Sequence, residues 1–560
     1  MKKQDKDMKW WQKTIVYECY PKSFLDTEGK GTGTLQGIIR KLDHLESLGV
    51  GALWLTPVYK SPMVDNGYDV EDYYEIDPLY GSMADMEELI EKGKQHDIKI
   101  VMDLVFNHSS DQCAWFLESK TSRDNPRSDW YIWADPKEDG SEPNNWRSIF
   151  GGSAWTWCEE RKQYYLHSFA SAQPDLNWEN PEVRKALYDI ARFWVDKGVG
   201  GFRIDAISYI KKPSEFTDGI PDGKDGLVSL NGVFNNTEGI LDFLHEFRDE
   251  VCKGRDIFTV GETNGISADM LNRWVGEDGV FDMIIEFTHI SPEFQNSELW
   301  YAPEEWKLSD LKKNLSGSQY IANNLGWYPI YFENHDKPRC VDHYFSDGCD
   351  KKAAAKLMAV LTMSMRGTPF IYQGQEIGMS NVHWQDIEMY RDICSYDQYE
   401  NALTAGCTDS EALRGLHRFA RDNARTPMQW NDSKYAGFST VEPWIGVNDD
   451  YHEVNVEKEE NDPDSVLNFY RRLNELRHKY PCLLEGRFIS LDDEDDSTYF
   501  YERRTEDELA RVLLNFTDKE IGYDRKLDED MEVLICSNKR HERGRLQPLE
   551  AVILYKDGKI

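Results

Sequence analysis

The pentapeptide Gly201-Phe202-Arg203-Ile204-Asp205 reads as a buried β-strand that ends in a charge pair. Phe202 and Ile204 are apolar residues that favour strands. Because residues two apart point to the same side of a strand, Arg203 and Asp205 are predicted to lie together. A neighbouring guanidinium lowers the pKa of a carboxyl group, so Asp205 should stay ionised at neutral pH. An ionised carboxylate at the tip of a strand is suited to nucleophilic attack.

Two other strand-like runs also end in an acid. Residues 257–262 end at Glu262, and residues 331–336 end at Asp336. Three acids at the ends of three separate strands indicate one active site. Paired carboxylates are the groups that cleave glycosidic bonds.

Short apolar runs alternate with helix-periodic segments on both sides of these stretches. Strands are predicted at residues 15–20, 52–57, 98–103 and 369–373, and helices at 83–96 and 181–197. Continued along the chain, the alternation amounts to about eight βα units. This pattern predicts an α/β fold, a (β/α)8 TIM barrel with its chemistry at the C-terminal ends of the strands.

Two regions break the alternation. Residues 110–177 are rich in Trp, Asn, Ser and Gly, which predicts a loop-rich domain inserted after the third strand. Beyond about residue 484 the pattern changes to short strands and turns, which predicts a C-terminal all-β domain, a β-sandwich, over 484–560. The barrel is then built from residues 1–109 and 178–483. The acidic run 492–496 is interpreted as a solvated turn.

The bulk composition narrows the class of ligand. The 560 residues carry a formal net charge of −36, which disfavours nucleic acid, anionic membranes and polyanionic substrates and fits a neutral ligand. Residues 1–9 precede no apolar run, so no signal peptide is expected, and no stretch is long enough to span a membrane. The ten scattered cysteines are expected to be free thiols, so the protein is expected to be cytoplasmic. Its oligomeric state stays open.

Six motifs occur in an order that identifies a family resemblance. Four are Asp103-Leu104-Val105-Phe106-Asn107-His108, Gly201–Asp205, Val260-Gly261-Glu262 and Asn334-His335-Asp336, and two more are Gln173-Pro174-Asp175-Leu176-Asn177 and the run from Arg421 to Trp430. Together they resemble the α-amylase family of retaining glycoside hydrolases, and within it the oligo-1,6-glucosidase and α-glucosidase branch. The match extends over nearly the whole chain.

The resemblance implies a role for each acid. Asp205 is the expected nucleophile, Glu262 the general acid/base, and Asp336 the group that stabilises the transition state. A general acid must hold its proton near neutral pH, so Glu262 is expected in a less polar setting close to negative charge. The nucleophile and the acid should lie roughly 5–5.5 Å apart. The alternative, an ordinary salt bridge at the end of a barrel, does not account for the ordered motifs.

The resemblance also implies a set of sugar-binding residues. His108 and His335 match the pair that hydrogen-bonds the sugar in the −1 subsite, and Arg203 belongs to the same set. Asp65 and Tyr68 match the residues that close the pocket around the non-reducing glucose.

An arginine is expected to pair with Asp65 in that pocket. Arg421 is the first choice and Arg425, four residues on, is the rival. A closed end of this kind makes the enzyme exo-acting.

The first loop departs from the calcium-binding version found in many family members. It reads Asp26-Thr27-Glu28-Gly29-Lys30-Gly31-Thr32-Gly33-Thr34, with Lys30 and Thr34 where such members usually have aspartates. A cation needs several oxygen ligands, and an ammonium in the loop repels it. We expect no metal and no cofactor, with Lys30 donating to Asp26 or to loop carbonyls.

The implied function is that of a retaining exo-acting α-glucosidase on α-1,4 and/or α-1,6 bonds of short malto- or isomalto-oligosaccharides. In the same resemblance, Ala206 after the nucleophile and the run Glu262-Thr263-Asn264-Gly265 look more like family members active on α-1,4 linkages. The alternatives are a sucrose isomerase, a trehalose-6-phosphate hydrolase and a catalytically inactive relative. The last loses its acids and keeps a membrane anchor, whereas this chain retains the acids.

Overall fold

The computed structural model describes residues 8–558 except 224, 267–269, 277 and 295–298. The absence of an export signal was predicted partly from residues 1–7, which lie outside the described part. The chain divides into two compact units. We call Trp54–Lys94 with Lys99–Glu286 the central unit, and Met1–Leu53, Gln95–Ile98 and Phe287–Ile560 the terminal unit.

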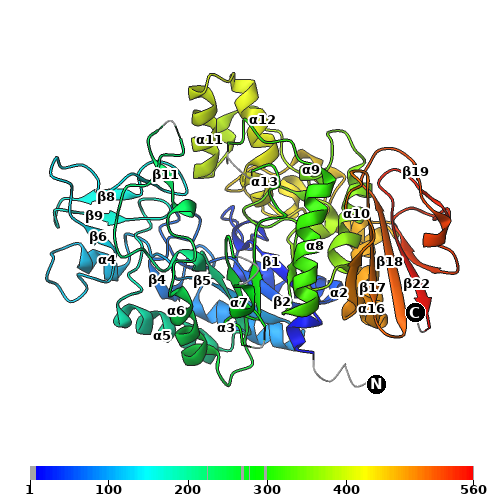
Figure 1. Ribbon diagram of the computed structural model, residues 1–560, viewed down its shortest axis with the longest axis horizontal. Coiled ribbons are helices and arrows are strands. Elements are labelled where there is room, and N and C mark those ends of the chain that lie inside the picture. The colour runs from blue at the N-terminus through cyan, green and yellow to red at the C-terminus, as the bar shows by residue number, and fades with distance from the viewer. Residues whose placement is uncertain (1–7, 224, 267–269, 277, 295–298, 559–560) are drawn as a thin grey trace. The chain divides into compact units, whose positions relative to one another are not determined.

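Eight strands form one sheet in the order β13-β12-β10-β5-β2-β1-β15-β14 (Figure 1). Their bounds are β1 Ile15–Cys19, β2 Val50–Leu55, β5 Lys99–Val105, β10 Gly201–Asp205, β12 Phe258–Glu262, β13 Met283–Ile285, β14 Pro329–Ile330 and β15 Thr368–Tyr372. Parallel registers join β1 to β15, β5 to β10, β10 to β12, β12 to β13 and β14 to β15. The predicted (β/α)8 barrel is confirmed.

Helices alternate with these strands along the chain. The longer ones are α3 Met83–Gln95, α5 Pro181–Lys197, α8 Leu308–Asn324, α10 Lys351–Ser364 and α15 Val466–Lys479. Helix α5 shows how local sequence sets its bounds. The Asn180 side chain accepts a hydrogen bond from the Glu182 amide, Pro181 occupies the first turn, and Gly198 ends the helix at φ 100°. The chain then enters β10 three residues later.

Register places the charged residues of the central unit. Strand β10 is buried along its whole length and pairs with β5 and β12. Arg203 lies opposite Asp103 of β5 and opposite Val260 of β12. Asp205 and Glu262 are the last residues of β10 and β12. Both acids therefore stand at carboxyl ends of strands, as predicted.

The segment after β5 forms small sheets of its own in the central unit. Strands β6 Trp133–Ala134, β9 Gln163–Leu166 and β8 Trp155–Cys158 form a three-stranded antiparallel sheet, and β7 Trp146–Arg147 pairs with β11 Val228–Ser229 (Figure 1). Trp146 and Trp155 pack in one apolar cluster with Ala206 and Tyr209, which follow the β10 acid. The limits 110–177 of the inserted domain stay a prediction.

In the terminal unit, the chain ends in a five-stranded antiparallel sheet ordered β16-β17-β18-β22-β20, drawn from orange to red in Figure 1. Its strands are β16 Arg487–Ser490, β17 Thr498–Arg504, β18 Glu508–Asn515, β20 Glu532–Cys536 and β22 Ala551–Asp557. This confirms a C-terminal antiparallel β-domain, while the boundary at 484 stays a prediction. The acidic run 492–496 is more than a solvated turn, because buried Lys312 of α8 donates to the carbonyls of Asp495 and Thr498.

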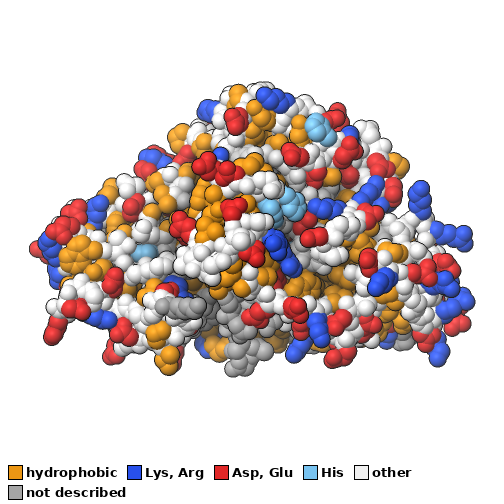
Figure 2. All heavy atoms as spheres, turned by 90° about the horizontal axis from the view of Figure 1, so that it is seen from above, with side chains coloured by type: hydrophobic (Ala, Val, Ile, Leu, Met, Phe, Trp, Pro, Cys, Tyr) orange, Lys and Arg blue, Asp and Glu red, His pale blue; other side chains and the backbone are white. Residues whose placement is uncertain are grey.

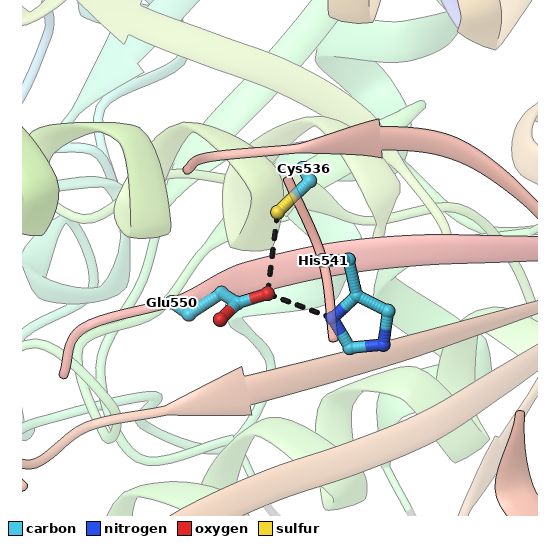
Figure 3. A group of neighbouring side chains, drawn as sticks. All are labelled: Cys536, His541 and Glu550. Atoms are coloured by element: carbon cyan, nitrogen blue, oxygen red, sulfur yellow. Dashed lines mark hydrogen bonds and ion pairs between the residues drawn. The ribbon is translucent and has the colours of Figure 1, made fainter. Parts of the chain in front are cut away.

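A buried polar group lies inside this C-terminal domain (Figure 3). The Cys536 thiol and the His541 ring both donate to Oε1 of Glu550, at 3.2 and 2.7 Å. Oε2 of Glu550 accepts the backbone amide of Gln547 at 2.7 Å. These bonds satisfy a fully buried carboxylate and account for the clustering of the three side chains.

One predicted strand is wrong. Residues 331–336 are not a strand, since β14 is only Pro329–Ile330, and Asp336 lies in a turn beyond it. The side chain of Asn334 accepts the backbone amide of Asp336 at 2.9 Å. An Asn side chain that bonds two residues ahead favours a turn over an extended ladder.

The structure bears on two expectations from the composition, namely free thiols and the absence of a membrane span. No disulfide joins any of the ten cysteines, all of which lie in the described part of the chain. Among the described residues, no helix combines the length and apolarity that a bilayer crossing requires. Acidic and basic side chains are interspersed over the face seen in Figure 2.

Candidate active site

A single buried guanidinium organises the acids of the central unit. Nη1 of Arg203 lies 2.7 Å from Oδ1 of Asp205 and 2.9 and 3.0 Å from the two carboxylate oxygens of Asp103. Nη2 lies 2.5 Å from Oε1 of Glu262. The predicted Arg203–Asp205 pair is therefore present. Since the cation touches all three carboxylates, it favours their charged forms.

A second contact also favours the charged form of Glu262. Its Oε2 accepts the backbone amide of Ala206 at 2.9 Å. Ala206 adopts a left-handed conformation with φ 45°, which turns its N–H toward β12 immediately after the β10 acid. These contacts do not provide the less polar setting predicted for Glu262. Its separation from Asp205 stays a prediction.

The predicted sugar-binding residues of the central unit also form one group. The Tyr68 hydroxyl donates to Oδ2 of Asp103 at 3.1 Å, so the ring is tied to the Arg203 network. The Tyr68 carbonyl lies 3.1 Å from Nε2 of His108. Gln173 donates to Oδ2 of Asp65 at 3.0 Å and lies 3.2 Å from His108. Sequence reasoning placed Gln173 in a motif without predicting its bond to Asp65.

His108 is a neutral, fully buried side chain. Burial lowers its pKa to about 4, against a smaller upward effect of Asp175. The Asn107 amide lies 3.2 Å from Nδ1 and donates to it, so Nε2 carries the proton and donates to the Tyr68 carbonyl. Behind it, buried Lys212 binds Asp175 at 2.8 Å and Asn107 at 2.7 Å. Lys212 carried no recognisable signal in the sequence.

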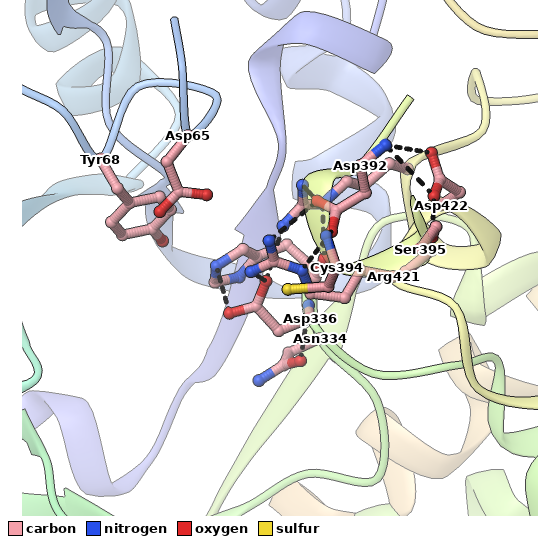
Figure 4. Close-up of polar contacts among 12 residues, drawn as sticks. Asp65, Tyr68, Asn334, Asp336, Asp392, Cys394, Ser395, Arg421 and Asp422 are labelled. Atoms are coloured by element: carbon pink, nitrogen blue, oxygen red, sulfur yellow. Dashed lines mark hydrogen bonds and ion pairs between the residues drawn. The ribbon is translucent and has the colours of Figure 1, made fainter. Parts of the chain in front are cut away.

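In the terminal unit, Asp336 is surrounded by three cations (Figure 4). Its Oδ1 lies 2.7 Å from Nη2 of Arg425 and 3.2 Å from Nη1 of Arg421. Its Oδ2 lies 3.3 Å from Nε2 of His335. Burial opposes ionisation, but His335 and the two arginines outweigh it and hold the pKa of Asp336 well below its usual range.

A buried carboxylate that sequence reasoning missed fixes both arginines. Asp392 accepts from Nε of Arg421 at 3.0 Å and from Nη1 of Arg425 at 2.5 Å (Figure 4). The backbone amide of Asp392 donates to the Asp422 carboxylate, which also accepts the Ser395 hydroxyl. Both arginines contact Asp336, so the two candidates act together there. The pairing of either with Asp65 stays a prediction.

His335 has a further partner on β1. Nδ1 of His335 lies 2.6 Å from Oε1 of Glu18, and the His335 backbone amide lies 3.2 Å from the same oxygen. Burial lowers the pKa of His335, but Asp336 and Glu18 outweigh it and raise the pKa to about 10. Glu18 was not among the predicted site residues. The available signal was a charged residue inside the otherwise uncharged, fully buried strand Ile15–Cys19.

In the first loop, which belongs to the terminal unit, the predicted partner of Lys30 is wrong. Lys30 pairs with Glu28 at 2.5 Å, not with Asp26 or a loop carbonyl. The Asp26 carboxylate is taken up by the backbone amides of Glu28, Gly29 and Gly31 and by the Ser439 hydroxyl, at 2.7–2.9 Å. Asp26 prefers these donors because a loop of short turns directs its own amides inward.

Each unit therefore brings its own predicted residues together. The central unit groups Asp65, Tyr68, His108, Arg203, Asp205 and Glu262, and the terminal unit groups His335, Asp336, Arg421 and Arg425. Carboxylates next to guanidinium and imidazole groups suit the cleavage of a neutral acetal linkage, where charge develops on the sugar.

Comparison with known proteins agrees with this chemistry. The family model described as the alpha amylase catalytic domain matches residues 18–486. An oligo-1,6-glucosidase of Parageobacillus thermoglucosidasius is 42% identical over 520 residues, covering 91% of both chains. A trehalose-6-phosphate hydrolase of Bacillus subtilis is 40% identical, covering 97% of this chain and 98% of that one.

Solved structures show the same fold. The isomaltulose synthase of Protaminobacter rubrum superposes with a TM-score of 0.92 at 38% identity, covering 98% of this chain and 99% of that one. A trehalose-6-phosphate hydrolase variant of Bacillus licheniformis superposes with a TM-score of 0.92 at 40% identity, covering 98% and 100%.

Proposed function

This chain belongs to the α-amylase family of glycoside hydrolases, and on that premise we propose that it is a retaining, exo-acting α-glucosidase. Its substrates would be short malto- or isomalto-oligosaccharides, cleaved at terminal non-reducing α-1,4 and/or α-1,6 bonds. The observation that carries the proposal is the buried Arg203, which holds Asp205 and Glu262 at the ends of adjacent strands. Two carboxylates in this relation suit a double displacement.

In the proposed reaction, Asp205 attacks the anomeric carbon and forms a covalent glycosyl-enzyme. Glu262 protonates the leaving oxygen and then, as a carboxylate, takes a proton from the attacking water. The contacts of Glu262 with Arg203 and the Ala206 amide stabilise its charged form, which is the product of the first step and the base of the second. Asp336, kept ionised by its three cations, would stabilise the oxocarbenium-like transition state.

Exo-action is proposed from the group formed by Asp65, Tyr68 and His108. Gln173 donates to the Asp65 carboxylate, His108 donates to the Tyr68 carbonyl, and the Tyr68 hydroxyl donates to Asp103, so the three side chains form a rigid polar wall. Such a wall suits the hydroxyls of one terminal glucose. Early products from maltoheptaose test this proposal. We expect glucose and maltohexaose, and a spread of mid-sized fragments would refute it.

We also propose a neutral oligosaccharide as the ligand and the cytoplasm as the location. A formal net charge of −36 repels polyanions. Ten reduced cysteines suit a reducing compartment.

The deciding experiment compares initial rates on maltose, isomaltose, sucrose, trehalose and trehalose 6-phosphate. We expect glucose release from maltose or isomaltose to be fastest. The names of the relatives define the competing outcomes: turnover confined to trehalose 6-phosphate would favour that hydrolase, and isomaltulose formed from sucrose would favour an isomerase. No turnover of any glucoside would indicate an inactive relative.

A further inference from the structure

Both ring nitrogens of His335 face carboxylate oxygens. Nδ1 lies 2.6 Å from Oε1 of Glu18, and Nε2 lies 3.3 Å from Oδ2 of Asp336. A neutral imidazole has one N–H and one lone pair, so one of its nitrogens would direct a lone pair at a carboxylate. Only the imidazolium form, with two N–H groups, suits both neighbours. Glu18 also accepts the backbone amide of His335, so one carboxylate holds both the backbone and the ring of this residue.

We propose that Glu18 is a positioning residue that keeps His335 as an imidazolium beside Asp336 during the glucosidase reaction. The proposal rests on the function proposed above and deepens it. Glu18 acts through His335 and Asp336.

In the chain of ion pairs that runs from Glu18 through His335 and Asp336 to Asp392, the charges balance when the His335 ring is protonated. The cations are His335, Arg421 and Arg425, and the anions are Glu18, Asp336 and Asp392. Burial raises the pKa of Tyr20, Cys19 and Tyr372 far above neutral pH, so these side chains add no charge. Arg339, which lies over the Tyr372 ring, has Glu333 as its own partner at 3.5 Å. Asp422 lies one step farther from the ring, where it accepts the backbone amide of Asp392 and the Ser395 hydroxyl. A neutral His335 would leave one uncompensated buried negative charge, which is costly.

Packing holds this arrangement in place. The Tyr20 ring stacks on His335, with centroids 6.5 Å apart and planes inclined by 11°. Nε of Arg425 donates to the His335 carbonyl at 3.0 Å. The ring therefore has little freedom to turn, and its protonation state decides whether it donates to Asp336 or repels it. Because Asp336 acts on the transition state, loss of the proton should reduce kcat more than it changes KM.

Glu18→Gln tests the charge while keeping the shape. The glutamine oxygen can still accept from Nδ1 and from the backbone amide, but it no longer stabilises a positive ring. His335 then titrates closer to the ordinary histidine value of about 6.5. The measurement is kcat/KM of variant relative to wild type from pH 5 to 9 on α-glucosyl fluoride. Fluoride departs with little need for protonation by Glu262, so the titration of Glu262 contributes little to the pH profile of the first step.

We expect the ratio to stay within about threefold of unity at pH 5, where His335 is protonated in both proteins. It should fall by about tenfold by pH 9, as the ring of the variant loses its proton. Glu18→Asp keeps the charge and should keep the ratio independent of pH. A Glu18→Gln ratio that does not change with pH, whatever its level, would reduce Glu18 to a structural role and overturn the proposal.

Glu293→Gln is the matched control. Glu293 and His343 form another buried pair in the same unit, also with an N–O distance of 2.6 Å. Loss of that charge should lower thermal stability without a pH-dependent activity ratio. If the same pH dependence appeared there, the effect would be general and the proposal for Glu18 would fail.

NMR titration of the full-length wild type decides the charge state without turnover. The His335 signals are assigned by comparison with His335→Gln, and we expect them to remain those of an imidazolium up to pH 9. Titration below pH 8 would overturn the proposal, also in the case where Glu18→Gln does not fold. A wild type with an imidazolium but no glucosidase activity would refute only the proposed function.

Discussion

Arg203 is the shared partner of three carboxylates in the central unit. Its side chain is fully buried and touches Asp103, Asp205 and Glu262. Removing such a cation would leave buried carboxylates uncompensated, a change that costs about 3–5 kcal/mol in other proteins. The same contacts favour the charged form of Asp205, which its proposed role as nucleophile requires.

Asp205→Asn should abolish turnover without unfolding the protein. The asparagine oxygen can still accept from Nη1 of Arg203, so the local structure is kept, but the amide is not a nucleophile. We expect activity on p-nitrophenyl α-glucoside to fall on the order of 10⁴-fold or more, in line with the loss of other covalent nucleophiles. The thermal midpoint should change by only a few degrees. Wild-type activity in this variant would show that another group attacks.

Ala206 combines a linkage effect with a backbone constraint. We predict kcat/KM for maltose at least equal to that for isomaltose, because a small side chain leaves room for a 4-linked leaving sugar. Ala206→Val should shift the ratio partly toward isomaltose, by an amount corresponding to about 1–3 kcal/mol. Because φ is 45° and the amide binds Glu262, a β-branched residue is strained there. The valine should therefore lower kcat on both sugars.

Ala206→Gly is the control for that strain. Glycine adopts positive φ readily and adds no bulk, so kcat should stay within about threefold of wild type. Steady-state rates on both disaccharides measure the two effects. A clear preference of the wild type for isomaltose would contradict the linkage prediction.

At the scale of elements, the three predicted catalytic acids lie on two kinds of local structure, strand ends and a turn. Asp205 and Glu262 end β10 and β12, where the hydrogen-bonded ladder fixes their direction. Asp336 instead lies in a turn held by Asn334, with its orientation set by Arg421 and Arg425. Strand ends position the proposed nucleophile and the proposed acid through the backbone, whereas the turn relies on ion pairs.

The loop Asp26–Thr34 should not depend on a metal. The Asp26 carboxylate already accepts from three backbone amides and from Ser439, and these bonds lower its pKa against the effect of burial. We expect the thermal midpoint and activity to be unchanged by EDTA. Asp26→Asn should lower the free energy of unfolding by about 1–3 kcal/mol, because the NH2 group of the asparagine would face the N–H and O–H donors that now bind the carboxylate.

Lys30→Gln is the control for the loop. The Lys30–Glu28 pair is about half exposed, and such pairs contribute little to stability. Its loss should shift the midpoint by about a degree or less. A midpoint that falls with EDTA and recovers with calcium would contradict the prediction for the whole loop.

At the scale of the whole molecule, two buried histidines give stability opposite dependences on pH. His108 has a pKa lowered to about 4 by burial, and His335 has a pKa raised to about 10 by Asp336 and Glu18. The His335 contribution is complete below about pH 6.5 and is lost as the pH rises toward 10. The His108 penalty is absent above about pH 6.5 and grows as the pH falls toward 4.

His108→Gln isolates the acid side of this balance. Between pH 6.5 and 4 the unfolded chain takes up a proton at residue 108 that the folded chain refuses. The wild type should therefore lose up to about 3 kcal/mol that the variant does not lose. Calorimetric midpoints at pH 7 and 4 measure the difference, with the exposed His452→Gln as control. Equal acid losses in wild type and His108→Gln would contradict the assigned neutral state.

The sequence by itself determined the family, the barrel and the residues at two strand ends. Helix α5 was predicted with its observed bounds, because an Asn-Pro start and a Gly stop are local signals. The Arg203–Asp205 pair followed from the two-residue period of one strand. In each case the information lies within a few neighbouring residues, where backbone geometry leaves few options.

Only the tertiary structure decided the partners of the charged groups. Glu18 and His335 are 317 residues apart, and no local pattern joins them. The same holds for Asp392 between two arginines and for Asp26, which binds the Ser439 hydroxyl from 413 residues away. Asp336 was placed on a strand because its apolar neighbours suggested one, but the Asn334 side chain binds the backbone and makes a turn. A buried charge takes whichever opposite charge the packed chain brings within reach, and that depends on how distant segments meet.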